Sequence, residues 1–438
     1  MSQLLFLIIL LAVAYFATQK FIRIKGNITL GLPHNICGDS AVRWKRMILI
    51  AFGQKKMFAR WIPAVMHLFI YVAFLFTQIE LIEIIIDGLA GTHRFFADKI
   101  GVLYNVLINF IEFLSLGAFV ATIVFLSRRN IIKLARFQKP EMKGWPSKDA
   151  NIILLLEITL IIGIFSMNGA DVVLQGIDSE HYKSTGHLFV SSHLGPALFG
   201  GLDAGTLHIV ERFGWWLHIL VVFGFVLYLP YSKHLHIFLS FPNVYFSNLH
   251  PSSKMENMPE IMNEVKSMFG LETDGVGADM SSGELPVFGS NDVTNLSWKN
   301  LMDAYSCTEC GRCTSVCPAN ITGKKLSPRK IMMDVRDRAE VVGNEIFSKG
   351  IKKEEFNDGK SLFDSINREE IHACTSCQAC VEACPVLINP LEIILKLRRY
   401  EILTESAGPA EWLPMFNAIE NAGSPWQMSV ERDEWIRS

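Results

Sequence analysis

Five long apolar stretches constrain the fold of this 438-residue chain more than any other feature of its sequence. They lie at about residues 3–22, 61–87, 101–127, 150–170 and 213–232. About 20 consecutive apolar residues suffice for a helix to cross the hydrocarbon core of a bilayer. Because a backbone in lipid must satisfy its hydrogen bonds internally, we expect these stretches to be transmembrane helices. The sequence therefore predicts an all-α protein, with a five-helix membrane bundle in residues 1–245 and a soluble part after it.

The first stretch is expected to remain in the mature protein. No basic segment precedes LLFLIILLAVAYFA, and no cleavage site of small residues follows it. A secretory signal peptide has both features. We therefore count this stretch as the first membrane span.

The overall charge excludes one class of function. The sequence holds 41 Lys and Arg residues against 43 Asp and Glu residues, so its net charge is −2. A protein that binds nucleic acid through its overall charge needs a strong basic excess, and we expect no nucleic-acid partner. Charged residues make up 19% of the sequence, below the roughly 25% of soluble domains, which agrees with a membrane half.

Basic residues in the loops predict the orientation of the spans. Nine Lys and Arg residues lie between residues 20 and 60, seven lie between residues 128 and 148, and the other two loops carry two each. Since basic loops stay on the cytoplasmic side, we expect the N-terminus outside and the soluble part in the cytoplasm. The expected location is a bacterial inner (cytoplasmic) membrane.

Two cysteine runs of the same form dominate the soluble half. Eight of the nine cysteines belong to them, and each run has the spacing Cys-x2-Cys-x2-Cys-x3-Cys-Pro. Three thiolates in such a tight loop bind one cubane, whereas the fourth reaches the other cluster. The sequence therefore predicts two 4Fe–4S clusters, one held by Cys307, Cys310, Cys313 and Cys384, and the other by Cys374, Cys377, Cys380 and Cys317.

Two other roles for these cysteines are disfavoured. Disulfides are rare in a segment that faces the cytoplasm. A zinc site uses paired Cys-x2-Cys elements with a longer gap, and a third cysteine followed by x3-Cys-Pro departs from that pattern. Cys37 lies outside the runs, and we expect it to be structural.

Histidines in the apolar stretches are the next signal. His67 lies within the second stretch, His218 lies near the outer end of the fifth, and His234 and His236 follow its inner end. Imidazole is costly to bury in hydrocarbon without a partner, and two imidazoles from neighbouring helices can ligate a haem iron. The alternative is a histidine that bonds a backbone carbonyl or reaches the headgroups, which applies more to His234 and His236 than to His67.

The last membrane segment carries a family resemblance. WWLHILVVFGFVLYLPYSKHLHIF, at 215–238, resembles the last helix of the cytochrome b (gamma) subunit of respiratory nitrate reductase. It is still more similar to the b-type anchors of heterodisulfide reductase-type complexes. In that pattern two histidines stand 18 residues apart, as His218 and His236 do. The resemblance implies that His67 and His236 ligate one haem b near the cytoplasmic face.

The same resemblance leaves a second haem open. Family members with two haems carry another histidine pair on the second span, ten residues apart, and here Thr77 stands where the partner of His67 would be. An outer haem on His218 would need a ligand from the long outer loop, where His193 and His208 are the candidates. We therefore expect one haem b, with a second on His218 as the alternative.

Four carboxylates fall inside the apolar stretches: Glu80, Glu83, Glu112 and Glu157. Ionisable residues in membrane spans often mark proton or substrate pathways. A site that reduces quinone needs proton exchange beside an electron donor, so Glu80 and Glu112 are candidates for that site. The alternative is a polar residue that pairs helices or lies near an interface, and it fits Glu83 and Glu157.

The soluble half resembles a second known module. The two cysteine runs begin 67 residues apart, and the segments IMMDVRDRAEVV and LEIILKLRRYEIL are expected to be helices. A long helical insert resembles the α-helical ferredoxin domain of succinate dehydrogenase iron–sulfur subunits and heterodisulfide reductase subunits. CTECGRCTSVCPANITGKKLSPRKIMMDVR is especially similar to the latter. We expect a linker at 246–300, the ferredoxin domain at 301–400 and a docking tail at 401–438.

One departure from the family bears on partners. Heterodisulfide reductase-type catalytic subunits, and the related membrane quinone oxidoreductases for electron-transferring flavoprotein, carry cysteine-rich repeats with a Cys-Cys pair. This sequence contains no Cys-Cys dipeptide. We therefore expect the catalytic module on another chain, a cytoplasmic cysteine-rich iron–sulfur or flavoprotein subunit.

Together these features predict an electron-transfer subunit of a membrane-bound oxidoreductase. Electrons would pass between the cytoplasmic partner, the two clusters, haem b and the (mena)quinone pool, in contact with membrane lipid. One alternative is a quinol-oxidising subunit of a disulfide or sulfur-compound reductase, which differs in the direction of flow. Another is a redox-sensing membrane protein without haem, in which His67 and His236 are replaceable without spectral effect.

Overall fold

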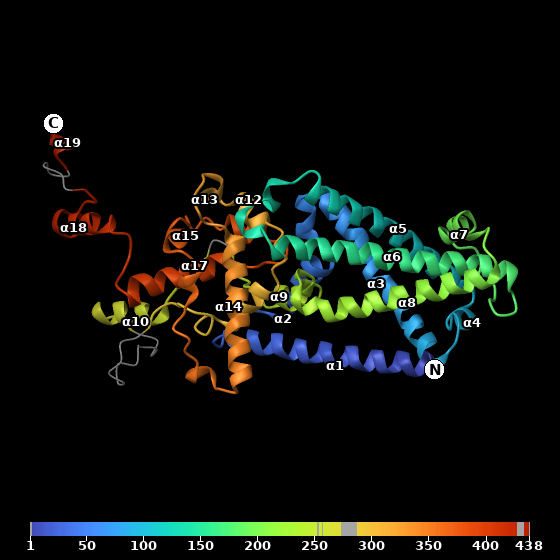
Figure 1. The fold of residues 1–438 in the computed structure, drawn as a ribbon. Coiled ribbons are helices and arrows are strands. Elements are labelled where there is room, and N and C mark those ends of the chain that lie inside the picture. The colour runs from blue at the N-terminus through green and yellow to red at the C-terminus, as the bar shows by residue number, and fades with distance from the viewer. Residues whose placement is uncertain (1, 252–253, 256, 273–286, 427–432, 438) are drawn as a thin grey trace.

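The computed structural model describes residues 2–251, 254–255, 257–272, 287–426 and 433–437. Within these residues no β-strand occurs, and one isolated β-bridge joins Leu32 to Ser297. The helices form a long bundle with a smaller domain at one end (Figure 1). The predicted all-α fold class is confirmed.

Five helices of the bundle are long and apolar enough to cross a membrane. In chain order they are α1 (Ser2–Ile28), α3 (Trp61–Ala90), α5 (Val102–Asn130), α6 (Trp145–Ile177) and α8 (Ala204–Tyr228). They extend along a common direction, as the predicted bundle of five spans requires (Figure 1). Several are longer than the apolar stretch that predicted them. With 33 residues, α6 exceeds the roughly 20 needed to cross the hydrocarbon, so its ends extend beyond it.

Glycines bring α6 and α8 close together. A Cβ atom at Gly214 of α8 would lie 2.6 Å from the backbone nitrogen of Met167, and one at Gly163 of α6 would lie 3.1 Å from that of His218. Small residues at a helix crossing let two backbones pack without side chains between them. This crossing places His218 directly against α6.

Short helical segments close the two ends of the bundle. At the end where the chain begins lie α4 (Ala97–Ile100) and α7 (Ser191–Phe199) (Figure 1). At the other end the rings of Trp44 and Tyr245 lie 5.3 Å apart and join two further helices. The elements at that end are α2 (Ser40–Met47), the π-helical turn Ile48–Phe52, the 3₁₀ turns Lys55–Ala59, Leu229–Tyr231 and Lys233–Leu235, and α9 (His236–Tyr245).

The smaller domain packs onto the first membrane helix. Its buried core includes Leu301, Ile331 and Ile394, and the same core takes in Ile24 and Leu30 from α1 and its C-terminal end. The domain is therefore fixed to the bundle by apolar contact as well as by the chain. Its helices are α11 (Trp298–Tyr305), α12 (Arg312–Val316), α13 (Pro318–Ile321), α14 (Pro328–Lys349), α15 (Arg368–His372), α16 (Ala379–Ala383) and α17 (Pro390–Arg399).

Two of these helices fall where the sequence predicts them. The segment IMMDVRDRAEVV lies inside α14, which runs across the end of the bundle (Figure 1). The segment LEIILKLRRYEIL forms α17 and continues into the π-helical turn Tyr400–Thr404. Both have one apolar face, and that face supplies the domain core.

The predicted linker at 246–300 is only partly a linker. Val293 and Leu296 are fully buried in the domain core, and Asp292 forms an ion pair with Arg338 of α14. Ser297 caps α11, so that helix begins before the predicted boundary. The packed domain therefore starts ahead of residue 301. Earlier in the segment lies α10 (Pro259–Met268), and residues 273–286 lie outside the described residues.

The segment predicted as a docking tail, 401–438, contains α18 (Trp412–Ala422) and α19 (Glu434–Arg437). Both extend away from the rest of the molecule (Figure 1). Leu413 and Phe416 of α18 are largely exposed. A docking role for this tail stays a prediction.

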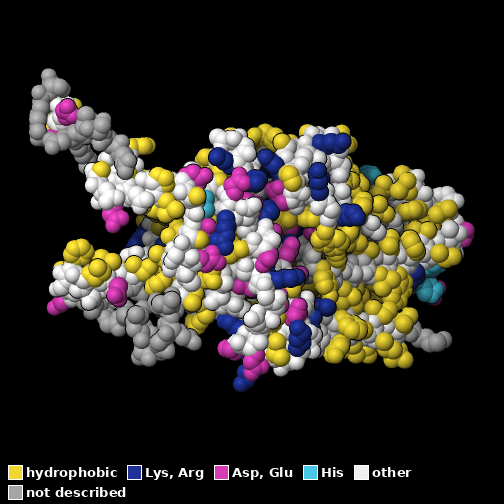
Figure 2. Space-filling model, turned by 60° about the vertical axis from the view of Figure 1, so that its left-hand side comes forward, with side chains coloured by type: hydrophobic (Ala, Val, Ile, Leu, Met, Phe, Trp, Pro, Cys, Tyr) yellow, Lys and Arg dark blue, Asp and Glu magenta, His cyan; other side chains and the backbone are white. Residues whose placement is uncertain are grey.

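The surface separates into two kinds. Apolar side chains cover the bundle, whereas Lys, Arg, Asp and Glu gather over the smaller domain and its junction with the bundle (Figure 2). Exposed Leu, Ile and Phe side chains recur along α1, α3 and α5. An apolar surface of this extent is stable in lipid and not in water. The chain is a membrane protein.

Candidate functional site

The two cysteine runs adopt the same backbone conformation. Each run has a left-handed residue two positions after its first cysteine, at Glu309 and Ser376, with φ of 54° in both. Each has another four positions after it, at Gly311 and Gln378, with φ of 70° and 63°. Such turns direct successive backbone N–H groups inward, which suits a negatively charged group. The likeness between the runs extends from their spacing to their backbone.

The structure brings the thiols together in two sets of four. Burial, together with the neighbouring Cys310, raises the pKa of Cys384 to about 12. The pKa of Cys307 is raised to about 12 by burial, with smaller contributions from Cys310 and Cys384. In the second set burial raises the pKa of Cys317, and Cys374 and Cys377 add to it. The last cysteine of each run therefore lies among the first three of the other run.

These sets fit a 4Fe–4S cluster better than a single ion. Buried thiols with raised pKa values become thiolates only beside a cation, which bound iron supplies. Among the described residues no three His, Cys, Asp or Glu side chains converge closely enough to hold one metal ion. A cubane tolerates wider spacing because its four ligand sulfurs bind four different iron atoms. Backbone N–H groups of Ser376 and Ile388 also donate to the sulfurs of Cys374 and Cys384, at 3.4 and 3.3 Å.

Glu309, between Cys307 and Cys310, connects the first cysteine run to the membrane bundle. Its carboxylate accepts from Nζ of Lys233 at 2.6 Å and from Arg336 of α14 at 2.8 Å. Burial alone would raise the pKa of Glu309, but the ammonium of Lys233 and the guanidinium of Arg336 hold it below its usual value. The carboxylate is therefore charged and held from both sides.

The rings of His67 of α3 and His236 at the start of α9 lie close together, with centres 6.4 Å apart and planes inclined at 45°. If an iron were bonded to both Nε2 atoms at about 2 Å, the ring centres would lie roughly 6 Å apart. Nδ1 of His236 lies 2.8 Å from the carbonyl of Lys233, and Nδ1 of His67 lies 3.1 Å from Oε1 of Gln54. Since those oxygens accept, each ring carries its proton on Nδ1 and keeps the Nε2 lone pair for a metal. This pair fits axial ligation of a haem.

His234 belongs to the same group of rings. Its ring stacks on Phe225 at 5.6 Å and lies 6.0 Å from that of His236. Burial lowers the pKa of His234 to about 3 and lowers that of His236, so both rings are neutral at pH 7. The 18-residue spacing from His218, taken from the family resemblance, selected His236 rather than His234. The bond from Nδ1 to the Lys233 carbonyl favours His236 as the partner of His67.

His218 lies apart from this pair. Its ring is buried, and Nδ1 bonds the carbonyl of Leu160 on α6 at 3.1 Å. The candidate partners are engaged elsewhere: the ring of His193 packs on that of His187, and Nε2 of His208 lies 3.2 Å from a carboxylate oxygen of Asp178. The structure therefore does not bring a second histidine to His218 within the described residues.

The two candidate carboxylates have different surroundings. Glu112 accepts from the backbone nitrogens of Val190 and Ser191, at 2.8 and 3.2 Å, and from the Ser191 hydroxyl, so it anchors the start of α7. Glu80 is buried, and its Oε1 has no hydrogen-bond partner among the described residues. Glu80 also lines a cavity of about 20 Å³ together with Arg94. Of these two, only Glu80 therefore has a carboxylate oxygen left for exchange.

The sequence did not single out Arg94 and Asp171. Arg94 is buried beyond the end of α3 and donates to Asp171 at 2.9 Å and to Asn168 at 2.7 Å. It also approaches the Tyr104 hydroxyl at 3.3 Å. Arg94 counted only as a loop charge, and Asp171 lies one residue past the predicted end of its span. The sequence did contain one signal for this pair: Arg94 and Asp171 are opposite charges, and each lies at the end of a span on the same side of the membrane.

Fold and sites together define a class, a membrane protein with a dicluster iron–sulfur domain. The family model described as "4Fe-4S dicluster domain" matches residues 306–388, which contain all eight cysteines of the two runs. The iron–sulfur part of the prediction is confirmed.

Comparison with known proteins then gives relatives. The chain is 26% identical to the probable iron-sulfur-binding oxidoreductase FadF of Bacillus subtilis over 99% of this chain and 60% of the relative. It is 29% identical to the EtfAB:quinone oxidoreductase of Syntrophomonas wolfei over 68% of this chain and 42% of the relative. It is 30% identical to one subunit of the dihydromethanophenazine:CoB--CoM heterodisulfide reductase of Methanosarcina mazei over 27% of this chain and 29% of the relative.

These matches show which proteins the chain is related to, but each covers only part of the relative. The chain spans at most 60% of the length of these relatives. No solved structure matches it. The protein is thus related to iron–sulfur oxidoreductases, including a heterodisulfide reductase subunit, as the cysteine segment predicted.

Proposed function

We propose that this chain is the electron-transfer part of a membrane-bound oxidoreductase. It passes electrons between a cytoplasmic catalytic partner, two 4Fe–4S clusters, one haem b and the (mena)quinone pool. The observation that carries the proposal is the double role of Lys233. Its ammonium bonds Glu309 between two cluster cysteines, and its carbonyl orients His236. The segment from Lys233 to His236 thereby contacts both the first cysteine run and the proposed haem site.

In this proposal the cofactors supply the redox chemistry and the protein supplies ligands and orientation. The eight cysteines hold the clusters in the two sets described above. Gln54 and the Lys233 carbonyl hold the His67 and His236 rings with Nε2 available. Fixed imidazoles lower the reorganisation that accompanies a change of oxidation state, because little has to move.

Quinone is the membrane partner in the proposal. Quinone reduction consumes protons, and Glu80, on the same helix as His67, is the candidate for their exchange. Its support is the unpartnered carboxylate oxygen beside a small cavity. The name of the Syntrophomonas wolfei relative couples EtfAB to quinone, which supports quinone as the membrane partner proposed for this chain.

A dithionite-reduced minus oxidised absorption spectrum of the detergent-purified chain tests the proposal. We expect about one b-type haem per chain, lost in His67→Ala and in His236→Ala. His234→Ala is the matched control, because its ring adjoins the pair, and it should retain the haem. Iron-loaded protein without any haem would overturn the haem assignment and favour the redox-sensing alternative.

The quinol-oxidising alternative is favoured by the similarity to a heterodisulfide reductase subunit. It uses the same cofactors with electrons flowing from the membrane to the cytoplasm. Redox titration of the clusters and the haem separates the two directions. Clusters more reducing than the haem favour flow toward quinone, and the reverse order favours flow toward a disulfide or sulfur compound.

A further inference from the structure

An open cavity of about 350 Å³ lies where the membrane bundle meets the ferredoxin domain. One wall comes from the start of α3 and the residue before it, and the other from the end of α5 and the loop that follows. The guanidinium of Arg60 at its edge bonds the Ser315 hydroxyl at 2.8 Å, which places the ferredoxin domain beside the cavity. The lining residues are Arg60, Trp61, Ile62, Pro63, Arg128, Leu134, Ala135 and Arg136.

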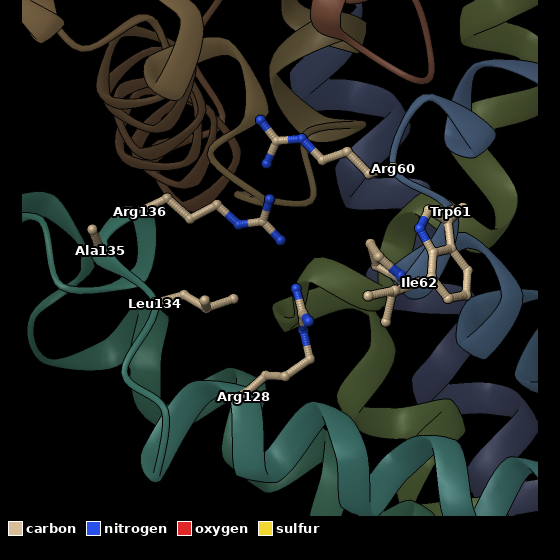
Figure 3. A pocket seen from close by; sticks show the side chains of 8 residues that line it. Arg60, Trp61, Ile62, Arg128, Leu134, Ala135 and Arg136 are labelled. Carbon is tan, nitrogen blue, oxygen red and sulfur yellow. The ribbon is translucent and has the colours of Figure 1, made fainter.

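Three guanidinium groups converge on this cavity. Figure 3 shows the side chains of Arg60, Arg128 and Arg136 pointing toward a common space from three separate segments. Among the described residues none of the three forms an ion pair with a carboxylate. By contrast, buried Arg94 and Arg329 each have an acidic partner, at 2.9 and 2.7 Å. Within the described part of the chain, the arginines of the cavity lack the carboxylate partner that Arg94 and Arg329 have.

No carboxylate among the described residues compensates the charge at this place, although Cys310 of the first cysteine run lies close enough to act electrostatically on Arg136. Nε of Arg136 is buried and has no hydrogen-bond partner among the described residues. Burial and the like charge of Arg60 lower the pKa of Arg136 to about 10, with Cys310 acting in the opposite direction, so the group is still protonated at pH 7. Bringing three positive charges together costs free energy unless an anion joins them. The cavity is therefore suited to an anion.

The position of the cavity indicates which anion. Trp61, which begins α3, is 68% exposed, and Ile62 beside it is 42% exposed. Tryptophan is enriched at the level of lipid headgroups, and Arg128 lies in the last turn of the α5 span. The cavity therefore opens at headgroup depth, with arginines inside and apolar side chains at the edge that faces lipid. A small soluble anion has no apolar part that could contact the side chains at that edge, whereas a lipid has acyl chains that can.

We propose that the three-arginine cavity binds the phosphodiester headgroup of an anionic phospholipid. Guanidinium forks match phosphate oxygens in pairs, and basic pockets between membrane helices on the cytoplasmic side bind anionic headgroups. The bound lipid would brace the junction, because the Arg136 carbonyl accepts from Arg329 of α14 at 2.7 Å and Arg60 holds Ser315. This inference does not depend on the proposed redox function.

Titration of the detergent-purified full-length chain with dihexanoyl phosphatidylglycerol tests the proposal. Dihexanoyl phosphatidylcholine and inorganic phosphate serve as separate arms. We expect the phosphatidylglycerol to bind most tightly, and Arg128→Gln/Arg136→Gln to weaken that binding about 30-fold, as two lost charges predict. The matched control is Lys133→Gln/Lys143→Gln, which removes equal charge from exposed residues of the same loop. It should change binding by less than about threefold.

Three outcomes would overturn the proposal. Inorganic phosphate that binds as tightly as phosphatidylglycerol would identify a site for free phosphate. Equal losses in the two variants would identify a general basic surface. Phosphatidylcholine that binds as tightly as phosphatidylglycerol would exclude recognition of an anionic headgroup. Arg128→Lys/Arg136→Lys, which keeps the charge but not the paired N–H donors, serves as a second variant if the glutamine pair fails to fold. It should bind phosphatidylglycerol more weakly than the natural chain does, and unchanged binding would contradict recognition by guanidinium forks.

Discussion

The ammonium of Lys233 in the membrane bundle donates a hydrogen bond to Oε2 of Glu309 in the ferredoxin domain, with Nζ and Oε2 2.6 Å apart, and both side chains are almost completely buried. Lys233 also lies 3.6 Å from Asp149 of α6, and Arg336 bonds the other oxygen of Glu309. The contact thus belongs to a buried group of alternating charges at the junction. Removing one member leaves another charge buried without its partner.

Lys233→Met should therefore destabilise the junction. We expect the free energy of unfolding to fall by about 3 kcal/mol, because Glu309 and Asp149 would both lose a buried partner. The measurement is thermal unfolding of the purified chain. Lys325→Met is the control: its ion pair with Glu369 is exposed, so the expected loss is below about 0.5 kcal/mol. Similar losses in the two variants would show that the junction is not held by this contact.

Much of the fold could be predicted because one-dimensional patterns determine it. Length and apolarity locate the spans, and the spacing of Cys307 to Cys317 requires a tight loop whatever lies around it. The burial of Val293 and Leu296 could not be predicted in the same way. They lie at the end of a segment rich in Gly, Ser and Asp, where composition indicates a linker, and only tertiary packing against α14 and α17 reverses that indication.

The candidate sites also divide into residues that a local sequence pattern identifies and residues that only tertiary packing brings together. His67 stood out because an imidazole inside an apolar stretch is rare. His236 was selected over His234 by the 18-residue spacing of the family pattern, whereas the bond from its Nδ1 to the Lys233 carbonyl depends on how the chain turns after α8. Arg128 and Arg136 were counted only as charges that set orientation. Their convergence with Arg60 depends on how α3 and α5 pack, which no local pattern records.

Gly214→Ala should weaken the packing of α6 against α8. The added Cβ would lie 2.6 Å from the Met167 nitrogen, a backbone atom that can move only with its helix. We expect a loss of about 1–3 kcal/mol in the free energy of unfolding, as is typical of overpacking. Gly224→Ala, in the same helix, is the control, because nothing lies within 4 Å of its added Cβ. A stability for Gly214→Ala equal to that of the control would contradict the close crossing.

The ion pair between Arg338 and Asp358 predicts a pH dependence. The bond from Arg338 holds the pKa of Asp358 at about 2, below its ordinary 3.8. A depressed pKa means that the pair stabilises the fold fully above about pH 4 and loses this effect as pH falls toward 2. Asp358→Asn should therefore lower Tm at pH 6, and its Tm should approach that of the natural chain as pH falls below 4. A difference that stays constant from pH 6 to pH 3 would contradict the assignment.

The exchange of the last cysteine between the two runs predicts which substitutions resemble each other. Cys384→Ser should lose the same cluster signal in electron paramagnetic resonance as Cys307→Ser, although the two residues belong to different runs. Cys317→Ser should match Cys374→Ser in the same way, since Cys317 lies beside Cys374 and Cys377. Each substitution should remove about four irons per chain, whereas Cys37→Ser, at an exposed cysteine outside both sets, should remove none. If Cys384→Ser instead matched Cys374→Ser, each run would hold its own cluster, and the grouping of the thiols in the structure would be wrong.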